Sequence, residues 1–247
     1  MTSSVLCRVL LLSLWCMAAG AEENDVINLH YDNRPPLIMV DEQGHASGIL
    51  AEPVVRIFAQ ARLRIKWQRT PNKRARTALK MSTGNDCSFG WYKTAERETF
   101  AVFSLPYYLD KPPAGLVRAD FVGAEWSNAA QLLGRPNISL TLRDGVAYGE
   151  YIDRLIDRMP QSQVTRLNTD SVPIAKMIHT GHTDLTILPL EEVSQVISSA
   201  GLRSQDFRIL FFVDLPHQDY RYVVCSRATD PQVVLRINKA IKEIGLP

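Results

Sequence analysis

Long apolar runs are scarce in this chain of 247 residues. The one run that stands out, residues 9–17, is shorter than the roughly 20 apolar residues that a membrane-spanning helix requires. No later segment is long and apolar enough to cross a bilayer. With 46% hydrophobic and 22% charged residues, the composition is that of a globular protein with a sizeable core, in one large domain or two small ones.

The chain also lacks a large excess of positive or negative charge. The chain has 28 Lys and Arg against 26 Asp and Glu, a formal net charge of +2, so the composition does not indicate a nucleic-acid partner. The short basic cluster at residues 73–76 is better explained as one face of a helix.

Signals for catalysis and for cofactors are few. The chain has no glycine-rich phosphate loop, and Cys87 and Ser88 lack a nucleophile-elbow context. His179 and His182 are three residues apart, but no third metal ligand lies nearby in the sequence. The sequence therefore predicts no metal and no cofactor.

The N-terminus has the features of a secretory signal peptide. Arg8 precedes the apolar run, and the small residues Ala19 and Ala21 stand at positions −3 and −1 of a cleavage site. Cys16 follows the bulky Trp15, where lipid attachment requires a small residue. We therefore expect residues 1–21 to be removed and the protein to reach the periplasm without a lipid anchor.

Cysteine is sparse beyond that signal. Of four cysteines, Cys87 and Cys225 follow residue 21. An oxidising compartment permits them to pair, whereas two buried free thiols are the alternative, and spacing alone does not decide between them.

Apolar periodicity predicts strands that alternate with helices. The first half has expected strands at 27–31, 37–40, 63–67 and 86–90 and helices at 50–61 and 72–81. After a break at residues 110–113 the alternation starts afresh, with strands at 114–118, 138–142, 164–167 and 185–188 and helices at 126–133, 150–159, 172–179 and 191–200. A strand at 220–225 and a helix at 233–244 follow. This order indicates an α/β fold with mostly parallel sheets, and the restart suits two similar units.

The densest group of polar signals is at residues 90–97. Thr94 is a good N-cap for a helix. A capping box would place Glu or Gln three residues later, but Arg97 stands there, a cation at the positive end of the helix. Exposed N–H groups beside a guanidinium suit a carboxylate or phosphate. The alternative is that Arg97 pairs with a nearby acid such as Glu98 or Glu52.

Several segments together resemble the bacterial extracellular solute-binding proteins of family 3. They are RPPL at residues 34–37, the loop at 41–44, Gly48, and TAERETFAVFSLPYY at 94–108. The resemblance implies a two-lobed periplasmic binding protein type II fold, in which each lobe is a mostly parallel sheet flanked by helices. Two hinge strands join the lobes, and the ligand binds between them.

The same resemblance gives the expected domain boundaries. Lobe 1 takes residues 22–115 and 221–247, and lobe 2 takes residues 116–220. The C-terminal helix is shorter than in typical members, as in a trimmed subfamily or a truncated chain. In this topology the strand with Cys87 lies beside the strand with Cys225, which implies a disulfide inside lobe 1 that does not lock the cleft.

Ligand-binding residues follow from the resemblance position by position. Arg97 matches the arginine that clamps a ligand carboxylate, with Gly90 and Tyr92 beside it at a strand end. Arg34 stands where the family has a wall aromatic, and Asn72 matches another wall position. The complete expected set is Tyr31, Arg34, Asn72, Phe89, Gly90, Tyr92, Thr94, Arg97, Arg143, Gly145, Tyr148 and Glu191.

Departures from the family pattern bear on the ligand. Family members carry an acid for the ligand ammonium where this chain has Pro189, and Glu191 is the nearest substitute. With Arg34, Arg97 and Arg143 all expected at the cleft, we predict a ligand more anionic than a simple amino acid.

Two other functions stay open at this point. One is an enzyme on the same fold, similar to a periplasmic prephenate or arogenate dehydratase, for which Glu52 and Glu191 are the available acids. The other is a ligandless interaction module. For the binding protein we expect a monomer whose closed form is recognised by a membrane transporter or a sensor protein.

Overall fold

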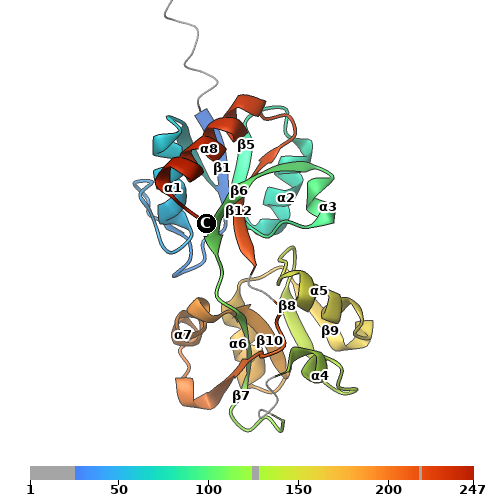
Figure 1. Cartoon of the computed structure of the whole chain (residues 1–247). Coiled ribbons are helices and arrows are strands. Elements are labelled where there is room, and N and C mark those ends of the chain that lie inside the picture. The colour runs from blue at the N-terminus through green and yellow to red at the C-terminus, as the bar shows by residue number, and fades with distance from the viewer. Residues whose placement is uncertain (1–25, 124–127, 217–218) are drawn as a thin grey trace, which may run out of the picture.

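The computed structural model describes residues 26–123, 128–216 and 219–247. The predicted signal peptide lies outside the described residues. Within those ranges, no helix combines the length and the apolar character needed to cross a membrane. Figure 1 shows two bodies, which we call lobe 1 (upper) and lobe 2 (lower), each built around its own sheet.

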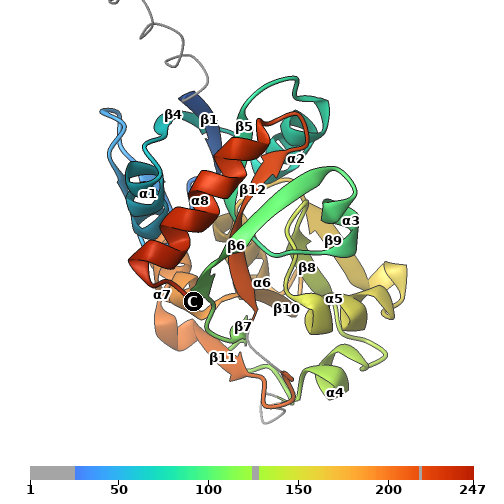
Figure 2. The same cartoon turned by 45° about the horizontal axis from the view of Figure 1, so that its top comes forward.

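Lobe 1 contains a five-stranded sheet in the order β4-β1-β5-β12-β6. Its strands are β1 (Val26–Tyr31), β4 (Arg64–Arg69), β5 (Asp86–Trp91), β6 (Ala101–Leu109) and β12 (Tyr220–Ser226). The helices are α1 (Ala51–Gln60), α2 (Asn72–Met81), α3 (Ala95–Glu98) and α8 (Pro231–Ile244), and β2 (Met39–Val40) pairs with β3 (Ala46–Ser47). Figure 2 shows α8 crossing the front of this sheet beside α1.

Lobe 2 contains the second five-stranded sheet, in the order β11-β7-β10-β8-β9. Its strands are β7 (Pro113–Arg118), β8 (Leu140–Arg143), β9 (Val164–Leu167), β10 (Leu185–Pro189) and β11 (Phe207–Phe211). The helices are α4 (Ala129–Leu133), α5 (Glu150–Asp157), α6 (Ser171–His179) and α7 (Leu190–Ser199), with short 3₁₀ turns at Gln161–Gln163 and Ser204–Asp206.

The α/β fold is confirmed, with a refinement of the sheets. In lobe 1, β12 runs antiparallel to both β5 and β6, and in lobe 2, β7 runs antiparallel to both β10 and β11. The other four strands of each sheet share one direction, so both sheets are mixed rather than uniformly parallel.

Each lobe has its own hydrophobic core. In lobe 1, Leu29 of the sheet packs with Phe58 of α1 and Ile237 of α8, and all three are fully buried. In lobe 2, Leu140 and Ile152 belong to one of two clusters of buried side chains. Burial of one such side chain contributes about 1.5–3 kcal/mol. Within the part of the chain that the structure describes, no hydrophobic cluster contains residues of both lobes, and polar contacts join the lobes instead.

The chain passes between the lobes twice. It leaves lobe 1 after Leu109 and enters lobe 2 at Pro113, and it returns between Phe211 and Tyr220. The two passages touch, because the backbone N–H of Asp110 donates to the carbonyl of Asp219 at 2.9 Å.

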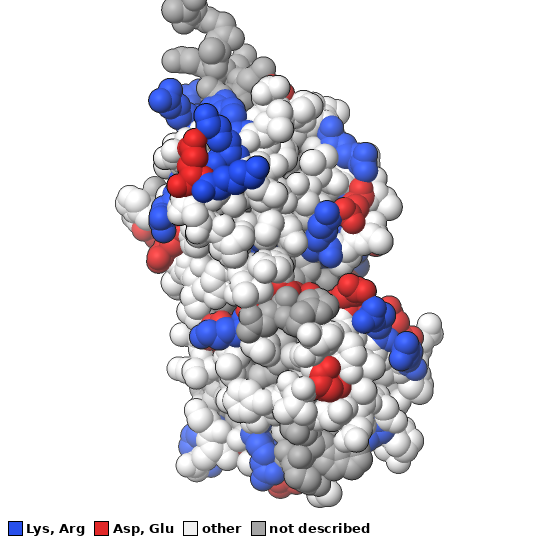
Figure 3. Space-filling view, viewed as in Figure 1, with Lys and Arg blue, Asp and Glu red and all other residues white. Residues whose placement is uncertain are grey.

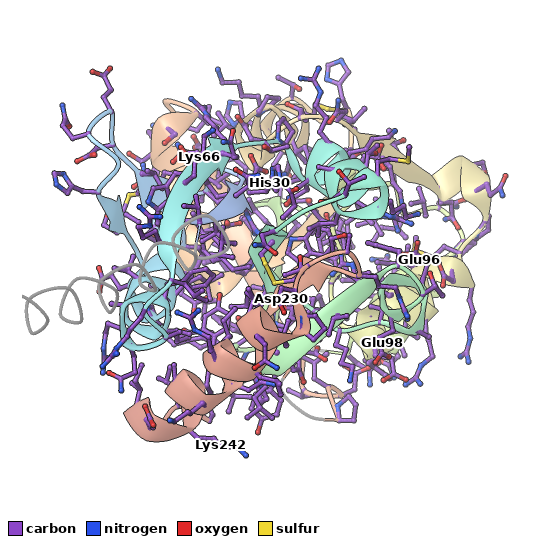
Figure 4. The ribbon with its side chains drawn as sticks, turned by 90° about the horizontal axis from the view of Figure 1, so that it is seen from above. His30, Lys66, Glu96, Glu98, Asp230 and Lys242 are labelled. Carbon is purple, nitrogen blue, oxygen red and sulfur yellow. A yellow bond between two sulfur atoms is a disulfide. The ribbon has the colours of Figure 1, made fainter. Side chains whose placement is uncertain are left out.

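A disulfide joins Cys87 of β5 to Cys225 of β12, two residues in register on adjacent strands. It is the yellow bond near the centre of Figure 4. Both cysteines lie within the sheet of lobe 1, so the bond does not cross between the lobes.

Candidate functional site

A small cavity lies between the lobes. Its volume is about 20 Å³, which is space for one or two water molecules. Lobe 1 contributes Arg34, Tyr92 and Arg221, and the remaining lining residues are Pro113, Arg143, Val146, Ala147, Tyr148, Ser171, Ile187, Leu188, Pro189 and Glu192. A solute of amino-acid size therefore enters only when the lobes separate.

The cavity includes four members of the expected set. Arg34, Tyr92, Arg143 and Tyr148 line it. The others lie around it or away from it: Tyr31, Asn72, Phe89, Gly90, Thr94, Arg97, Gly145 and Glu191. The sequence reasoning missed the charged residues Glu192 and Arg221, which do line it.

Arg34 forms an ion pair with Glu192 across the cleft. Arg34 follows β1 in lobe 1, and Glu192 is in the first turn of α7 in lobe 2. The distance from Arg34 Nε to Glu192 Oε1 is 2.8 Å, and their side chains are 10% and 4% exposed. Burial lowers the pKa of Arg34, but the carboxylates of Glu192 and Asp32 together outweigh it and the pKa is raised.

The alignment of this pair is poor. Neither Arg34 Nε nor Glu192 Oε1 has a hydrogen-bond partner, although the two atoms are in ion-pair contact. Hydrogen bonds weaken steeply when the donor points away from the acceptor. The pair therefore provides charge compensation without the hydrogen bond that normally accompanies it.

A second ion pair also joins the lobes, but here the arginine is in lobe 2 and the carboxylate in lobe 1. Arg143 Nη2, at the end of β8 in lobe 2, lies 2.5 Å from Asp32 Oδ2 in lobe 1. Both residues also have partners in their own lobe: Arg143 Nε donates to the carbonyl of Thr169 at 3.0 Å, and Asn72 Nδ2 donates to Asp32 at 3.3 Å. The backbone N–H of Arg143 donates to the Tyr148 hydroxyl at 2.8 Å.

Arg221 is part of a buried network between the two chain passages. Its Nε donates to Asp110 at 2.7 Å, its Nη1 to the carbonyl of Gly90 at 2.8 Å and its Nη2 to the Tyr92 hydroxyl at 2.9 Å. Burial raises the pKa of Tyr92 well above its ordinary value, so this phenol stays neutral and donates to Asp110. The Arg221 guanidinium is thus well satisfied within the protein.

Arg97 differs from the other buried arginines of the site. As expected, the Thr94 side chain caps α3 by accepting from the backbone N–H of Arg97, at 3.3 Å. The guanidinium donates to the carbonyls of Tyr92 at 2.8 Å and Gly145 at 3.5 Å, one in each lobe, and lies 4.8 Å from the Trp91 ring centroid. Among the described residues, no carboxylate oxygen lies within 4.0 Å of it. Burial lowers its pKa to about 10, so the group remains a cation at neutral pH.

The other acids that the sequence suggested for the site lie elsewhere. Glu98 pairs with Lys93 at 2.9 Å, and Glu52 is exposed and accepts from the backbone N–H of Gly48, so neither is a partner of Arg97. The distance from Glu191 Oε1 to Lys111 Nζ is 3.8 Å. Among the residues that the structure describes, no group of three His, Cys, Asp or Glu side chains is arranged to hold a metal.

A further ion pair, more exposed than the first two, joins the lobes. Lys73 Nζ of lobe 1 lies 2.7 Å from Asp144 Oδ2 of lobe 2. On the face shown in Figure 3, basic and acidic side chains are interspersed over both lobes, and acidic side chains lie at the waist between them. Where the lobes touch, the ion pairs already described bring side chains of opposite charge together.

Comparison with known proteins gives one family and many structures of the same fold. The profile described as bacterial extracellular solute-binding proteins, family 3, matches residues 27–245. No curated protein sequence matches significantly.

Three solved structures are representative. The arginine-bound form of truncated ArgBP from T. maritima has a TM-score of 0.69 at 17% sequence identity, over 90% of this chain and 97% of that one. EhuB in complex with hydroxyectoine has a TM-score of 0.73 at 15% sequence identity, over 90% of this chain and 84% of that one. The ancestral amino acid-binding protein AncCDT-1, a precursor of cyclohexadienyl dehydratase, has a TM-score of 0.65 at 14% identity, over 90% and 89%. At these identities the likeness shows the two-lobed fold.

Proposed function

Because the chain belongs to the bacterial extracellular solute-binding proteins of family 3, we propose that it captures a small, anionic, carboxylate-bearing solute between its lobes. In this proposal the protein is exported to the periplasm by the segment at residues 1–21. Separation of the lobes admits the solute, and closure around it presents a surface to a membrane transporter or sensor protein.

The observation that carries the proposal is the state of Arg97. Its guanidinium is buried and cationic, and its hydrogen-bond partners are two neutral carbonyl groups. A buried cation without a carboxylate in direct contact is costly, and a carboxylate accepting from a guanidinium forms a strong charge-assisted bond. A solute carboxylate that replaces the longer bond to Gly145 supplies the missing negative charge.

Most arginines at the cleft add no uncompensated positive charge. Arg34, Arg143 and Arg221 each have a carboxylate partner within the protein, in Glu192, Asp32 and Asp110. The anionic preference therefore rests on Arg97 alone.

The experiment measures binding by calorimetry across amino acids and dicarboxylates. We expect Arg97→Ala to weaken binding of the best ligand at least about tenfold, because a hydrogen bond to a charged group is lost. Arg203→Ala is the matched control, since the Arg203 side chain is 72% exposed and away from the cavity. Affinity confined to neutral or basic amino acids, or left intact in Arg97→Ala, contradicts the proposal. Turnover of the bound solute favours the dehydratase alternative.

A further inference from the structure

One wall of the cavity is apolar. Lobe 2 provides this side, which we call the apolar wall: Pro113, Val146, Ala147, Ile187, Leu188 and Pro189. Pro113 and Pro189 are opposite each other in register at the ends of β7 and β10. Proline has no backbone N–H, so neither residue offers a solute a backbone hydrogen-bond donor at this end of the sheet.

The cations of the cleft leave one position for a negative group. Arg34, Arg143 and Arg221 line the cavity, and each has a carboxylate partner within the protein. Arg97 has no carboxylate oxygen within 4.0 Å among the described residues. A solute with one carboxylate therefore balances the charge, whereas a second carboxylate meets only arginines that already have a negative partner.

Arg97 is beside the apolar wall. Its guanidinium donates to the carbonyls of Tyr92 and Gly145. Tyr92 lines the cavity, and Gly145 immediately precedes Val146 of the wall. A carboxylate that replaces the bond to Gly145 thus places the rest of the solute next to Val146.

The neutral polar side chains of the cavity do not change this balance. They are Tyr92, Tyr148 and Ser171. The Tyr92 hydroxyl donates to Asp110, and the Tyr148 hydroxyl accepts from the backbone N–H of Arg143. Hydroxyl groups can bind a neutral oxygen of a solute, but they supply no positive charge for a second carboxylate.

Closure of the lobes discriminates between the two kinds of solute. A cavity of about 20 Å³ holds no solute, so the lobes part to admit one and exclude water when they close again. A second carboxylate enclosed against the apolar wall loses its water without gaining a cation, which is strongly unfavourable. An apolar body gains instead, by about fourfold in affinity for each CH₂ group that is buried.

We infer that the solute is a monocarboxylate with an apolar body, an aliphatic chain or a ring, and that Val146 and Pro189 of the apolar wall select for this body. The inference rests on the proposed function and adds the substrate class. Arg97 binds the carboxylate, and the apolar wall packs against the remainder of the solute.

The test compares acids of equal chain length that differ only at the far end. Calorimetry measures the affinities of butanoate and succinate, of pentanoate and glutarate, and of hexanoate and adipate, where a methyl group in one acid replaces a carboxylate in the other. We expect the wild-type protein to bind the monocarboxylate about tenfold or more tightly in at least one pair. Affinity should also rise from propanoate to pentanoate, by about fourfold for each CH₂ group.

A single substitution tests the apolar wall directly. In Val146→Thr the side chain keeps nearly the same shape and gains a hydroxyl, which can donate to a second carboxylate and has no partner beside a methyl group. The preference for the monocarboxylate should fall about threefold or more. Val164→Thr is the matched control, because Val164 packs against the same core cluster as Val146 but is outside the cavity lining, and the preference should stay at the wild-type value.

The outcomes separate this inference from the proposed function. Equal or tighter binding of the dicarboxylate in every pair, no binding of any monocarboxylate, or a preference that Val146→Thr leaves unchanged overturns the inference. If a dicarboxylate binds more tightly and Arg97→Ala abolishes that binding, the apolar selection is wrong and the carboxylate proposal stands. If Arg97→Ala leaves the binding of a monocarboxylate intact, the proposed function fails, and the inference fails with it.

Discussion

Lys73 Nζ and Asp144 Oδ2 are 2.7 Å apart, and this contact joins α2 of lobe 1 to the loop that follows β8 in lobe 2. The hydrogen bond from Lys73 lowers the pKa of Asp144, so the carboxylate stays ionised. Beside it, Gly145 has a φ of +76°, and a Cβ there would lie 3.3 Å from the backbone nitrogen of Lys73. The two lobes approach each other closely at this point.

Reversal of the charge at Lys73 should open the cleft. The pair is partly exposed, with side chains 63% and 30% accessible, so its contribution is about 1 kcal/mol or less. Lys73→Glu replaces this attraction by a repulsion of similar size, which is enough to shift the ratio of closed to open forms several-fold. Small-angle scattering on the ligand-free protein should report a larger radius of gyration.

The swapped variant is the control. Lys73→Glu with Asp144→Lys restores opposite charges and should return the radius of gyration to the wild-type value. Salt screens exposed charges, so the difference between wild type and Lys73→Glu should shrink at 1 M salt. A radius that does not change in Lys73→Glu shows that this pair does not hold the lobes together.

Removal of the disulfide should affect stability more than binding. Cys87 and Cys225 are separated by 138 residues in the sequence, and a cross-link over so long a loop contributes about 4–5 kcal/mol in the chain-entropy description. Cys87→Ser with Cys225→Ser should lower the midpoint of urea unfolding, while the affinity for the best ligand stays within about twofold because the bond is remote from the cavity.

Two measurements bear on that prediction. Thiol titration of denatured, unreduced protein after signal removal should find neither Cys87 nor Cys225 reactive. Two titratable thiols would show that the bond does not form. A loss of affinity equal to the loss of stability would instead couple the disulfide to the cleft.

The sequence was informative wherever a local rule decides the structure. Helix 72–81 and strand 164–167 have the expected bounds because their periodicity is unbroken. Strands β6 and β11 were not predicted as strands. β6 contains Pro106, which is tolerated because β6 lies at the edge of its sheet, where a proline breaks no ladder on the outer side. β11 is likewise an edge strand.

Some site residues could be found from the sequence and others could not. Arg97 was recognisable as a cation where the capping pattern calls for an acid or amide. Glu192 was recognisable in principle, because it shares the buried stripe of α7 with Val196 four residues later, whereas Glu191 does not. The partners Asp32 and Asp110 were not recognisable, since each is 111 residues from its arginine in the sequence and the contact depends on how distant segments of the chain meet.

The buried Asp153 should make stability depend on pH. Asp153 is in the first turn of α5, and both of its carboxylate oxygens accept from the backbone N–H of Tyr148, at 3.1 and 3.2 Å. Burial raises its pKa to about 6 from 3.8, more than this contact and the nearby arginines lower it. The folded protein therefore holds the Asp153 proton more tightly than the unfolded chain does.

The sign follows from proton linkage. Between pH 4 and pH 6 the folded state binds more protons at this site than the unfolded state, so the stability contributed by protonated Asp153 is present below pH 4 and is lost as the pH rises through 6. Asp153→Asn keeps an acceptor for Tyr148 and cannot ionise. Relative to wild type, it should gain on the order of 2 kcal/mol between pH 4 and pH 7 in urea unfolding. Asp157→Asn, in the same helix, is the control. If the difference between Asp153→Asn and wild type is the same at both pH values, Asp153 titrates alike in the folded and unfolded chain and its burial has no effect on stability.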